Sequence, residues 1–200
     1  MVKKNYDQDI VDDFGDEWEI YDHSSANFQE LEKQFFNYFN VFPWSEMVVN
    51  GVGADIGCGT GRWARFVADK VNLLICLDAS DKVVKIVKRN TSDKKNCHVV
   101  QGRVDALPFP DNSLDFAYSL GVLHHLPNTL NAIKKCMKTL KPGAPFLLYL
   151  YYAFDNRPKW YLFVWKCSEF FRKIISRSPF FLKYCLSSII AVFIYLPFAR

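Results

Sequence analysis

Three alternate glycines form the segment of this sequence that is best suited to hold a ligand. They lie in Ala54-Asp55-Ile56-Gly57-Cys58-Gly59-Thr60-Gly61-Arg62, which follows a short apolar run. Glycine lets the backbone turn tightly and approach a ligand closely, and the start of a following helix offers unpaired N–H groups. The segment predicts a site for a nucleotide-like ligand, and a plain strand-to-helix turn without a ligand is the alternative.

Two common nucleotide-binding loops fit this segment less well. A dinucleotide loop has the pattern Gly-x-Gly-x-x-Gly, and here the sixth position is Arg62. A Walker loop needs Gly-Lys-Ser or Gly-Lys-Thr, which does not follow these glycines. An NAD-dependent oxidoreductase therefore stays only a minor alternative.

Further along the chain, one acid and two histidines have types and positions that suit a ligand site. Asp78 lies 21 residues after Gly57, one expected helix and one expected strand later, so it should come beside the glycine loop. A carboxylate there could accept hydrogen bonds from two hydroxyls, although it could also be a strand-end turn residue. His124 and His125 could supply a general base because imidazole titrates near neutral pH, or they could simply order their loop.

The elements that must position these residues follow from the hydrophobic pattern. Short apolar runs alternate with helical stretches, which is typical of an α/β protein with a parallel sheet covered on both faces. We predict strands near Val52–Ile56, Leu73–Leu77, His98–Gln101, Leu114–Tyr118 and Ala144–Tyr151. We predict helices near Phe28–Phe39, Arg62–Val71, Lys82–Arg89 and Thr129–Leu140. Right-handed crossovers then give a Rossmann-like, doubly wound sheet of strand order 3-2-1-4-5, with its ligand crevice at the carboxyl ends of the strands.

Several motifs of this region occur in an order typical of one family. They are Asp55 to Gly61, Leu77-Asp78-Ala79-Ser80, Val104-Asp105-Ala106-Leu107-Pro108-Phe109, Ser113 to Tyr118 with Val122-Leu123-His124-His125-Leu126, and Leu140-Lys141-Pro142-Gly143-Ala144. With these motifs, residues 52–152 resemble the class I S-adenosylmethionine-dependent methyltransferases, and among them the methyltransferase type 11 group.

The resemblance implies a cofactor, a reaction and a set of site residues. S-adenosylmethionine would be the cofactor, with its methionine part in the glycine loop, its ribose hydroxyls on Asp78 and its adenine amino group on Asp105. The implied cofactor-binding residues are Asp55, Gly57, Cys58, Gly59, Thr60, Gly61, Asp78, Ala79, Asp105, Ala106 and Ser119. His124 and His125 are the candidate catalytic residues, and the expected reaction is methyl transfer to a small-molecule, lipid-linked or sugar-linked acceptor.

Composition and charge limit the other function classes. The chain has 200 residues, of which 50% are hydrophobic, so extensive disorder is excluded. Residues 1–50 hold 3 basic against 11 acidic side chains, whereas residues 155–200 hold 8 against 2, which argues against a nucleic-acid grip over the whole protein. The six cysteines and four histidines do not have the spacing of a zinc site, so we expect no metal. Residues 1–25 lack an apolar run, so we expect reduced thiols and a cytoplasmic protein, with membrane association as an alternative.

The chain divides into three expected parts. Residues 1–50 are an acidic arm and a helix, residues 51–152 the cofactor-binding domain, and residues 153–200 an amphipathic and apolar helical segment. Residues 1–24 lack a clear pattern and are expected to form a solvated arm. Its Trp18 predicts either a lid over the cofactor crevice or simple docking on the helix at residues 28–39.

The last part of the chain departs from the family pattern. Two helices, at residues 159–176 and 180–198, would occupy the place of the hairpin that normally completes the sheet. The first has a polar stripe and a broad apolar face, and the second contains the uncharged stretch 184–199, slightly short for a membrane span. We expect a buried or substrate-covering helix, with peripheral membrane contact through 159–199 or a true span as alternatives. A shortened, inactive relic acting as a partner subunit is the competing function.

Overall fold

The computed structural model describes residues 5–23, 27–151 and 157–176, together with the single residues 179, 182 and 189. The chain divides into two compact units, residues 1–151 and residues 152–200, which are described separately. The predicted helix at 180–198 and most of the stretch 184–199 lie outside the described residues.

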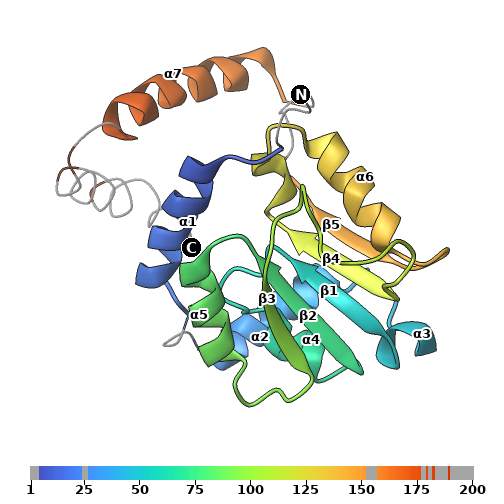
Figure 1. The fold of residues 1–200 in the computed structure, drawn as a ribbon. Helices are drawn as coiled ribbons and strands as arrows, with labels where there is room; N and C mark the ends of the chain where they lie inside the picture. Colours follow the sequence, from blue (N-terminus) through green and yellow to red (C-terminus); the bar gives the residue numbers. More distant parts are fainter. Residues whose placement is uncertain are drawn as a thin grey trace. The chain divides into compact units, whose positions relative to one another are not determined.

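The first unit is built on a parallel sheet of five strands in the order β3-β2-β1-β4-β5, which confirms the predicted topology (Figure 1). The strands are β1 (Val52–Ile56), β2 (Leu73–Asp78), β3 (Cys97–Gln101), β4 (Phe116–Leu120) and β5 (Phe146–Tyr149). β4 begins at Phe116, two residues later than predicted, and Leu114 before it donates its N–H to the carbonyl of Thr139. Among the described residues, no strand follows β5.

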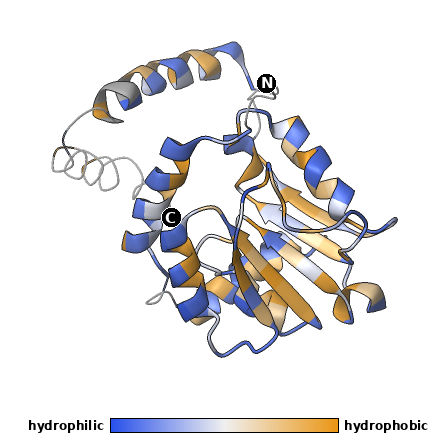
Figure 2. Ribbon diagram, viewed as in Figure 1, coloured by the Kyte–Doolittle hydropathy of each residue, from blue (hydrophilic) through white to orange (hydrophobic). Residues whose placement is uncertain are grey.

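Helices cover both faces of the sheet, so the central strands β1, β2 and β4 are largely buried and carry hydrophobic residues (Figure 2). One core cluster includes Phe35 of α2, Phe66 of α4 and Val87 of α5. The other joins Ile56 of β1 to Ala132 and Cys136 of α6. The helices concerned are α2 (Phe28–Phe39), α4 (Ala64–Ala68), α5 (Asp81–Asn90) and α6 (Thr129–Thr139), and the short elements α3 (Glu46–Val49) and η1 (Leu123–His125) complete this part of the unit.

The amino-terminal segment differs from its prediction. Instead of an unpatterned arm, it forms the helix α1 (Gln8–Ile20), so that prediction was wrong. The Asp7 carboxylate caps the helix by accepting hydrogen bonds from the N–H groups of Asp9 and Ile10, at 3.1 and 3.4 Å. The many acids obscured a simple signal, because Ile10, Phe14 and Trp18 recur every four residues and share one helix face.

The described part of the second unit is mainly the helix α7 (Lys159–Ser176). Its apolar residues Trp160, Phe163, Val164 and Phe170 are exposed. In the sequence, Lys166, Glu169 and Lys173 follow one another at three- and four-residue steps and form a polar stripe along this helix. None of the described helices has the length and apolar character needed to span a bilayer.

Candidate functional site

The glycine loop joins β1 to α4 and is fixed on two sides. The N–H groups of Gly57 and Cys58 both donate to the carbonyl of Leu77 at the end of β2, at 2.7 and 3.1 Å. Gly57 has a φ of +77°, and a Cβ at this position would lie 2.5 Å from a methyl group of Val122. Only glycine fits such a conformation and such close packing. The loop is therefore held between the ends of β2 and β4.

Asp78 ends β2 with its carboxylate bound to the loop. Its Oδ2 accepts from the Gly59 N–H at 3.1 Å, and its Oδ1 accepts from the Ser80 N–H at 3.1 Å. Burial raises the pKa of Asp78, and the two N–H donors oppose that shift because they favour the charged form. Each carboxylate oxygen can accept more than one hydrogen bond, so Asp78 keeps capacity for two hydroxyl donors.

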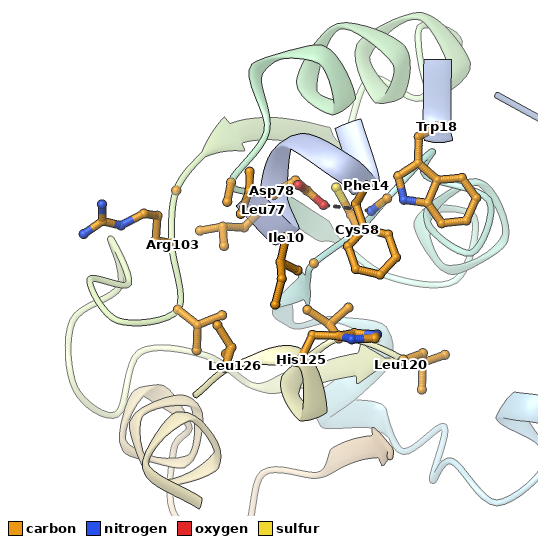
Figure 3. A pocket seen from close by; sticks show the side chains of 18 of the residues that line it. Ile10, Phe14, Trp18, Cys58, Leu77, Asp78, Arg103, Leu120, His125 and Leu126 are labelled. Atoms are coloured by element: carbon orange, nitrogen blue, oxygen red, sulfur yellow. Dashed lines mark hydrogen bonds between the residues drawn. The ribbon is translucent and has the colours of Figure 1, made fainter. Parts of the chain in front are cut away.

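A cavity opens where the glycine loop, Asp78 and the end of β4 meet (Figure 3). α1 forms its cover, because Ile10, Phe14 and Trp18 project from this helix into the cavity. His125 and Leu126 line the side opposite α1, and Arg103 lies at the end away from Trp18. The cavity is thus enclosed by segments that lie far apart in the sequence.

Polar contacts hold α1 over the cavity at both ends. Near its start, Asn5 donates to the carbonyl of Asn128 at 2.8 Å and accepts from the Asn128 N–H at 2.6 Å. Beyond its end, Asn90 of α5 donates to the carbonyls of both Asp22 and Thr60, each at 2.9 Å. Further contacts on this side are the pairs Lys82–Asp16, Lys82–Glu19 and Arg89–Asp22 and the bond between Thr60 Oγ1 and His23 Nδ1 at 3.1 Å.

The two histidines of η1 have different surroundings. His125 lines the cavity and packs edge-on against Phe14, with 4.8 Å between the ring centroids. Burial, and then the neighbouring His124, lowers the pKa of His125, so this imidazole is neutral near pH 7 and can accept a proton. His124 lies against Tyr151, at 4.1 Å between centroids, and its ring nitrogens have no partner among the described residues.

The cavity brings together part of the predicted site. The expected residues that line it are Gly57, Cys58, Gly59, Thr60, Asp78, Ala79 and His125. The expected residues that are not in its lining are Asp55, Gly61, Asp105, Ala106, Ser119 and His124. The first group therefore carries the candidate site in this structure.

Contacts elsewhere in the fold hold several residues of the second group. Ser119 is buried and donates to the carbonyl of Ile56 at 2.8 Å, which ties β4 to β1. Gly61 has a φ of +75° and packs against Val87. The Asp105 carboxylate is bound by Arg103 at 3.0 and 3.2 Å, so Gly102, Arg103 and Val104 line that end of the cavity instead.

Asp55 lies in the core beneath the loop. It is 2% exposed, and its Oδ2 has no hydrogen-bond partner among the described residues. Burial raises the pKa of Asp55 well above that of an exposed carboxyl. Its position supports the loop from below and does not contact the cavity.

Several residues of the cavity were not predicted from the sequence. Arg62 and Trp63 line it directly after the glycine loop, and Leu120, Gly121 and Val122 line it at the end of β4. Their adjacency to predicted motifs was a usable signal. The α1 residues also had a signal, which was the four-residue spacing described above.

Comparison with known proteins agrees with this arrangement. The family described as "Methyltransferase domain" matches residues 54–148. A demethylmenaquinone methyltransferase of Staphylococcus aureus is 28% identical over 132 residues, which cover 58% of this chain and 55% of that protein. The chain thus spans about half the length of the curated relatives it matches.

Solved structures show the same fold. The YcgJ protein of Bacillus subtilis is 25% identical with a TM-score of 0.51, over 61% of this chain and 50% of that chain. Phosphoethanolamine N-methyltransferase 1 of Haemonchus contortus, solved with phosphoethanolamine and S-adenosylhomocysteine, is 18% identical with a TM-score of 0.53, over 66% of this chain and 30% of that chain. The second likeness concerns the fold alone.

Proposed function

We propose that this chain, whose residues 54–148 match the methyltransferase family, transfers a methyl group from S-adenosylmethionine to a small-molecule acceptor. The observation that carries the proposal is the convergence of the Asp78 carboxylate and the glycine loop in one cavity covered by α1. When bound, S-adenosylmethionine supplies an electrophilic methyl group, whose bond to sulfur breaks with the electron pair left on sulfur.

The residues of the cavity suit what such a transfer asks of the protein. Asp78 would accept hydrogen bonds from the two ribose hydroxyls, and the glycine loop at Gly57 and Gly59, which lines the cavity, would hold the methionine part. α1 excludes water by covering the cavity, which keeps the acceptor aligned with the methyl group. His125, neutral near pH 7, would take the proton that an acceptor hydroxyl or amine loses.

Asp78→Ala tests the cofactor site. We expect the variant to bind S-adenosylhomocysteine about tenfold more weakly or worse by titration calorimetry, because it loses a charge-assisted contact to two hydroxyls. Asp81→Ala is the matched control, since Asp81 is an exposed acid of α5 paired with Lys85. Asp78→Asn and thermal melts separate the binding effect from a folding defect. Equal affinities of the Asp78 variants and the wild type would refute the assignment.

A methyl-transfer assay separates the enzyme from an inactive relic. Labelled S-adenosylmethionine is incubated with the protein and a small-molecule extract of cells, and labelled products are separated from the cofactor. We expect labelled product with the wild type and about a hundredfold less with His125→Ala, because loss of a general base typically costs this much. Cofactor binding without transfer to any acceptor would favour the relic.

We also propose that α1 is a lid over the cofactor cavity. The helix covers the cavity, yet the only residue it buries is Gly15. Its remaining attachments are largely exposed ion pairs and hydrogen bonds, which are individually weak. Trp18 lies at the glycine loop, since a Cβ on Gly59 would be 3.7 Å from its ring. The weak attachment of α1 and the position of Trp18 favour a helix that opens and closes over the cofactor.

A peripheral membrane contact through α7 is a separate proposal about partners. Trp160 and Phe163 are 66% and 69% exposed, and Lys159 and Lys166 add positive charge on the same helix. Such a helix can lie in the headgroup region of an anionic bilayer. Flotation with vesicles containing phosphatidylglycerol should recover the protein, and Trp160→Ser with Phe163→Ser should reduce recovery severalfold. Ser168→Ala is the control. Equal recovery of the wild type, the double variant and this control would refute the contact.

A further inference from the structure

The end of α5 meets both the glycine loop and the end of the α1 segment. Asn90, the last residue of α5, donates from its amide nitrogen to the carbonyl of Thr60 and to the carbonyl of Asp22, each at 2.9 Å. An amide nitrogen carries two hydrogens, so these two bonds use both of its donors. One side chain thus joins the loop that lines the cavity to the segment that covers it.

Thr60 contacts the cavity and the α1 segment at the same time. It is 2% exposed and lies in the cavity lining, and its Oγ1 bonds to Nδ1 of His23 at 3.1 Å. Gly61, which follows it, packs so closely on α5 that a Cβ there would lie 2.5 Å from a methyl group of Val87. A ligand that fixes Thr60 therefore fixes one partner of both Asn90 and His23.

His23 adopts a backbone conformation that depends on these contacts. Its φ is +57°, in the left-handed region that residues other than glycine rarely adopt. Such a backbone persists where surrounding contacts hold it, and here they are the bond to Thr60 and the Trp18 ring, 5.6 Å away between centroids. Asn90 binds the preceding carbonyl, that of Asp22. Loss of the Asn90 bridge would therefore allow this turn to relax and α1 to leave the loop.

We propose that Asn90 is a positioning residue that couples cofactor binding to closure of α1. A bound cofactor would hold the loop at Thr60, and Asn90 would transmit that constraint to Asp22 at the end of the α1 segment. The coupling is reciprocal, because a closed α1 must strengthen cofactor binding by the same factor by which the cofactor favours closure. This inference rests on the proposed function, since it takes S-adenosylmethionine as the ligand of the cavity and α1 as its lid.

Proteolysis and calorimetry measure the two sides of this coupling. A glutamyl endopeptidase cleaves after Glu17 and Glu19 in α1, and the cleavage rate is measured with and without saturating S-adenosylhomocysteine. If α1 is cleaved only when open, the factor by which the ligand slows cleavage equals the factor by which closure strengthens binding. We expect the ligand to slow cleavage of the wild type about tenfold and that of Asn90→Ala about twofold or less. Affinity for S-adenosylhomocysteine should fall in Asn90→Ala by the same ratio, about fivefold.

Two further variants make the result specific. Asn96→Ala is the matched control, because Asn96 likewise donates to two carbonyls, those of Ala68 and Val71 at 2.7 and 2.8 Å, and is not in the cavity lining. It should lower the unfolding midpoint in urea by an amount similar to that in Asn90→Ala and leave both the protection of α1 and the affinity unchanged. Asn90→Ser retains one hydrogen-bond donor and cannot bridge two carbonyls, so its protection should stay as low as in Asn90→Ala.

The outcomes that overturn this inference are distinct from failure of the proposed function. Full protection of α1 in Asn90→Ala or in Asn90→Ser would overturn it, since the bridge would then not couple the two parts. So would weaker binding with unchanged protection in Asn90→Ala, because Asn90 would then shape only the loop. An equal loss of protection in Asn96→Ala would also overturn it, since general destabilisation would explain the effect.

The wild type separates the two proposals. If it binds S-adenosylhomocysteine without any protection of α1, the coupling is overturned and the cofactor site stands. If it does not bind S-adenosylhomocysteine at all, the proposed function fails and this inference fails with it.

Discussion

The two amino-terminal helices α1 and α2 are attached to the same domain by different forces. α2 buries Leu31, Phe35 and Phe39 in the core. Phe35 stacks on Phe66 at 5.1 Å between centroids, and Phe39 meets Tyr118 edge to face at 5.2 Å. Burying each such side chain contributes about 1.5–3 kcal/mol. In α1 only Gly15 is fully buried, and the helix is attached by polar contacts and by the packing of Phe14 on His125.

This difference in attachment indicates which helix can move without unfolding the domain. Removing α2 would expose a large apolar surface, so α2 should stay in place in every folded state. Removing α1 would expose mainly Ile10, Phe14 and Trp18, which already face a cavity. A ligand that fills the cavity gives these side chains more to contact, so its binding should tighten the attachment of α1.

The largest expected effect concerns α2. Phe39→Ala should lower the free energy of unfolding by about 3–5 kcal/mol, because it leaves a cavity in the aromatic cluster. Phe14→Ala is the matched change in α1 and should lower it by less than about 1 kcal/mol, since Phe14 is only partly buried and lines the cavity. Urea denaturation followed by circular dichroism measures both. Similar losses in the two variants would mean that α1 belongs to the core as much as α2 does.

The next effect sharpens the role of α1 in binding. Trp18→Ala should weaken S-adenosylhomocysteine binding about tenfold while leaving the unfolding midpoint in urea nearly unchanged, because Trp18 covers the glycine loop. Titration calorimetry and urea melts provide the two readouts. Trp160→Ala in α7 is the control for loss of an exposed tryptophan. Normal binding by Trp18→Ala would show that the cover over the loop does not contribute to affinity.

The attachment of α1 should also depend on pH. His23 at the end of the α1 segment has a pKa lowered by burial and then by Arg62, and burial lowers that of His125, which packs on Phe14. When α1 detaches, both histidines regain their ordinary pKa and bind more protons than in the docked state. The docked state is therefore most stable above the ordinary histidine pKa, and it loses stability as the pH falls through that value. Limited proteolysis within residues 8–20 should be faster at about pH 5.5 than at about pH 7.5.

Two variants check the origin of this pH effect. His23→Gln and His125→Gln together should flatten the dependence, whereas His98→Gln should not, since His98 lies in β3, at the far side of the sheet order from β4 and β5. A dependence that persists in the double variant would point to other groups.

The smallest effect concerns the exposed ion pairs of α1. Asp16 and Glu19 both bind Lys82 and raise its pKa. Lys82→Ala should increase cleavage within α1 by only about twofold, because exposed ion pairs contribute little and are screened by salt. The wild type should lose the same protection in about 1 M salt. A much larger increase would show that Lys82 is the main attachment of α1.

The sequence predicted those parts of the molecule whose determinants are local. The order of the strands followed from alternating apolar and helical segments, and the meeting of Asp78 with the glycine loop followed from the parallel register, which pairs Ile56 with Leu77. α1 was missed because its apolar residues face a cavity and are diluted by acids, so no broad apolar stripe marks it.

Side-chain placement was the part that sequence could not determine. Asp105 and Arg103 are two residues apart, and only the folded turn shows that their side chains pair. In that turn Arg103 lines the cavity and Asp105 does not. His124 and His125 are adjacent, yet only His125 is in the lining. Motif matching gives a position in the chain, whereas the direction of a side chain depends on contacts from distant segments.

The bonds between Asn5 and Asn128 join residues 123 positions apart. During synthesis α1 is made first, but its attachment sites on α5 and at the start of α6 are made long afterwards. Contacts of such long range cost loop-closure entropy and form slowly. The nascent chain must therefore carry α1 undocked until the sheet has assembled, and the cavity becomes enclosed only as a late step of folding.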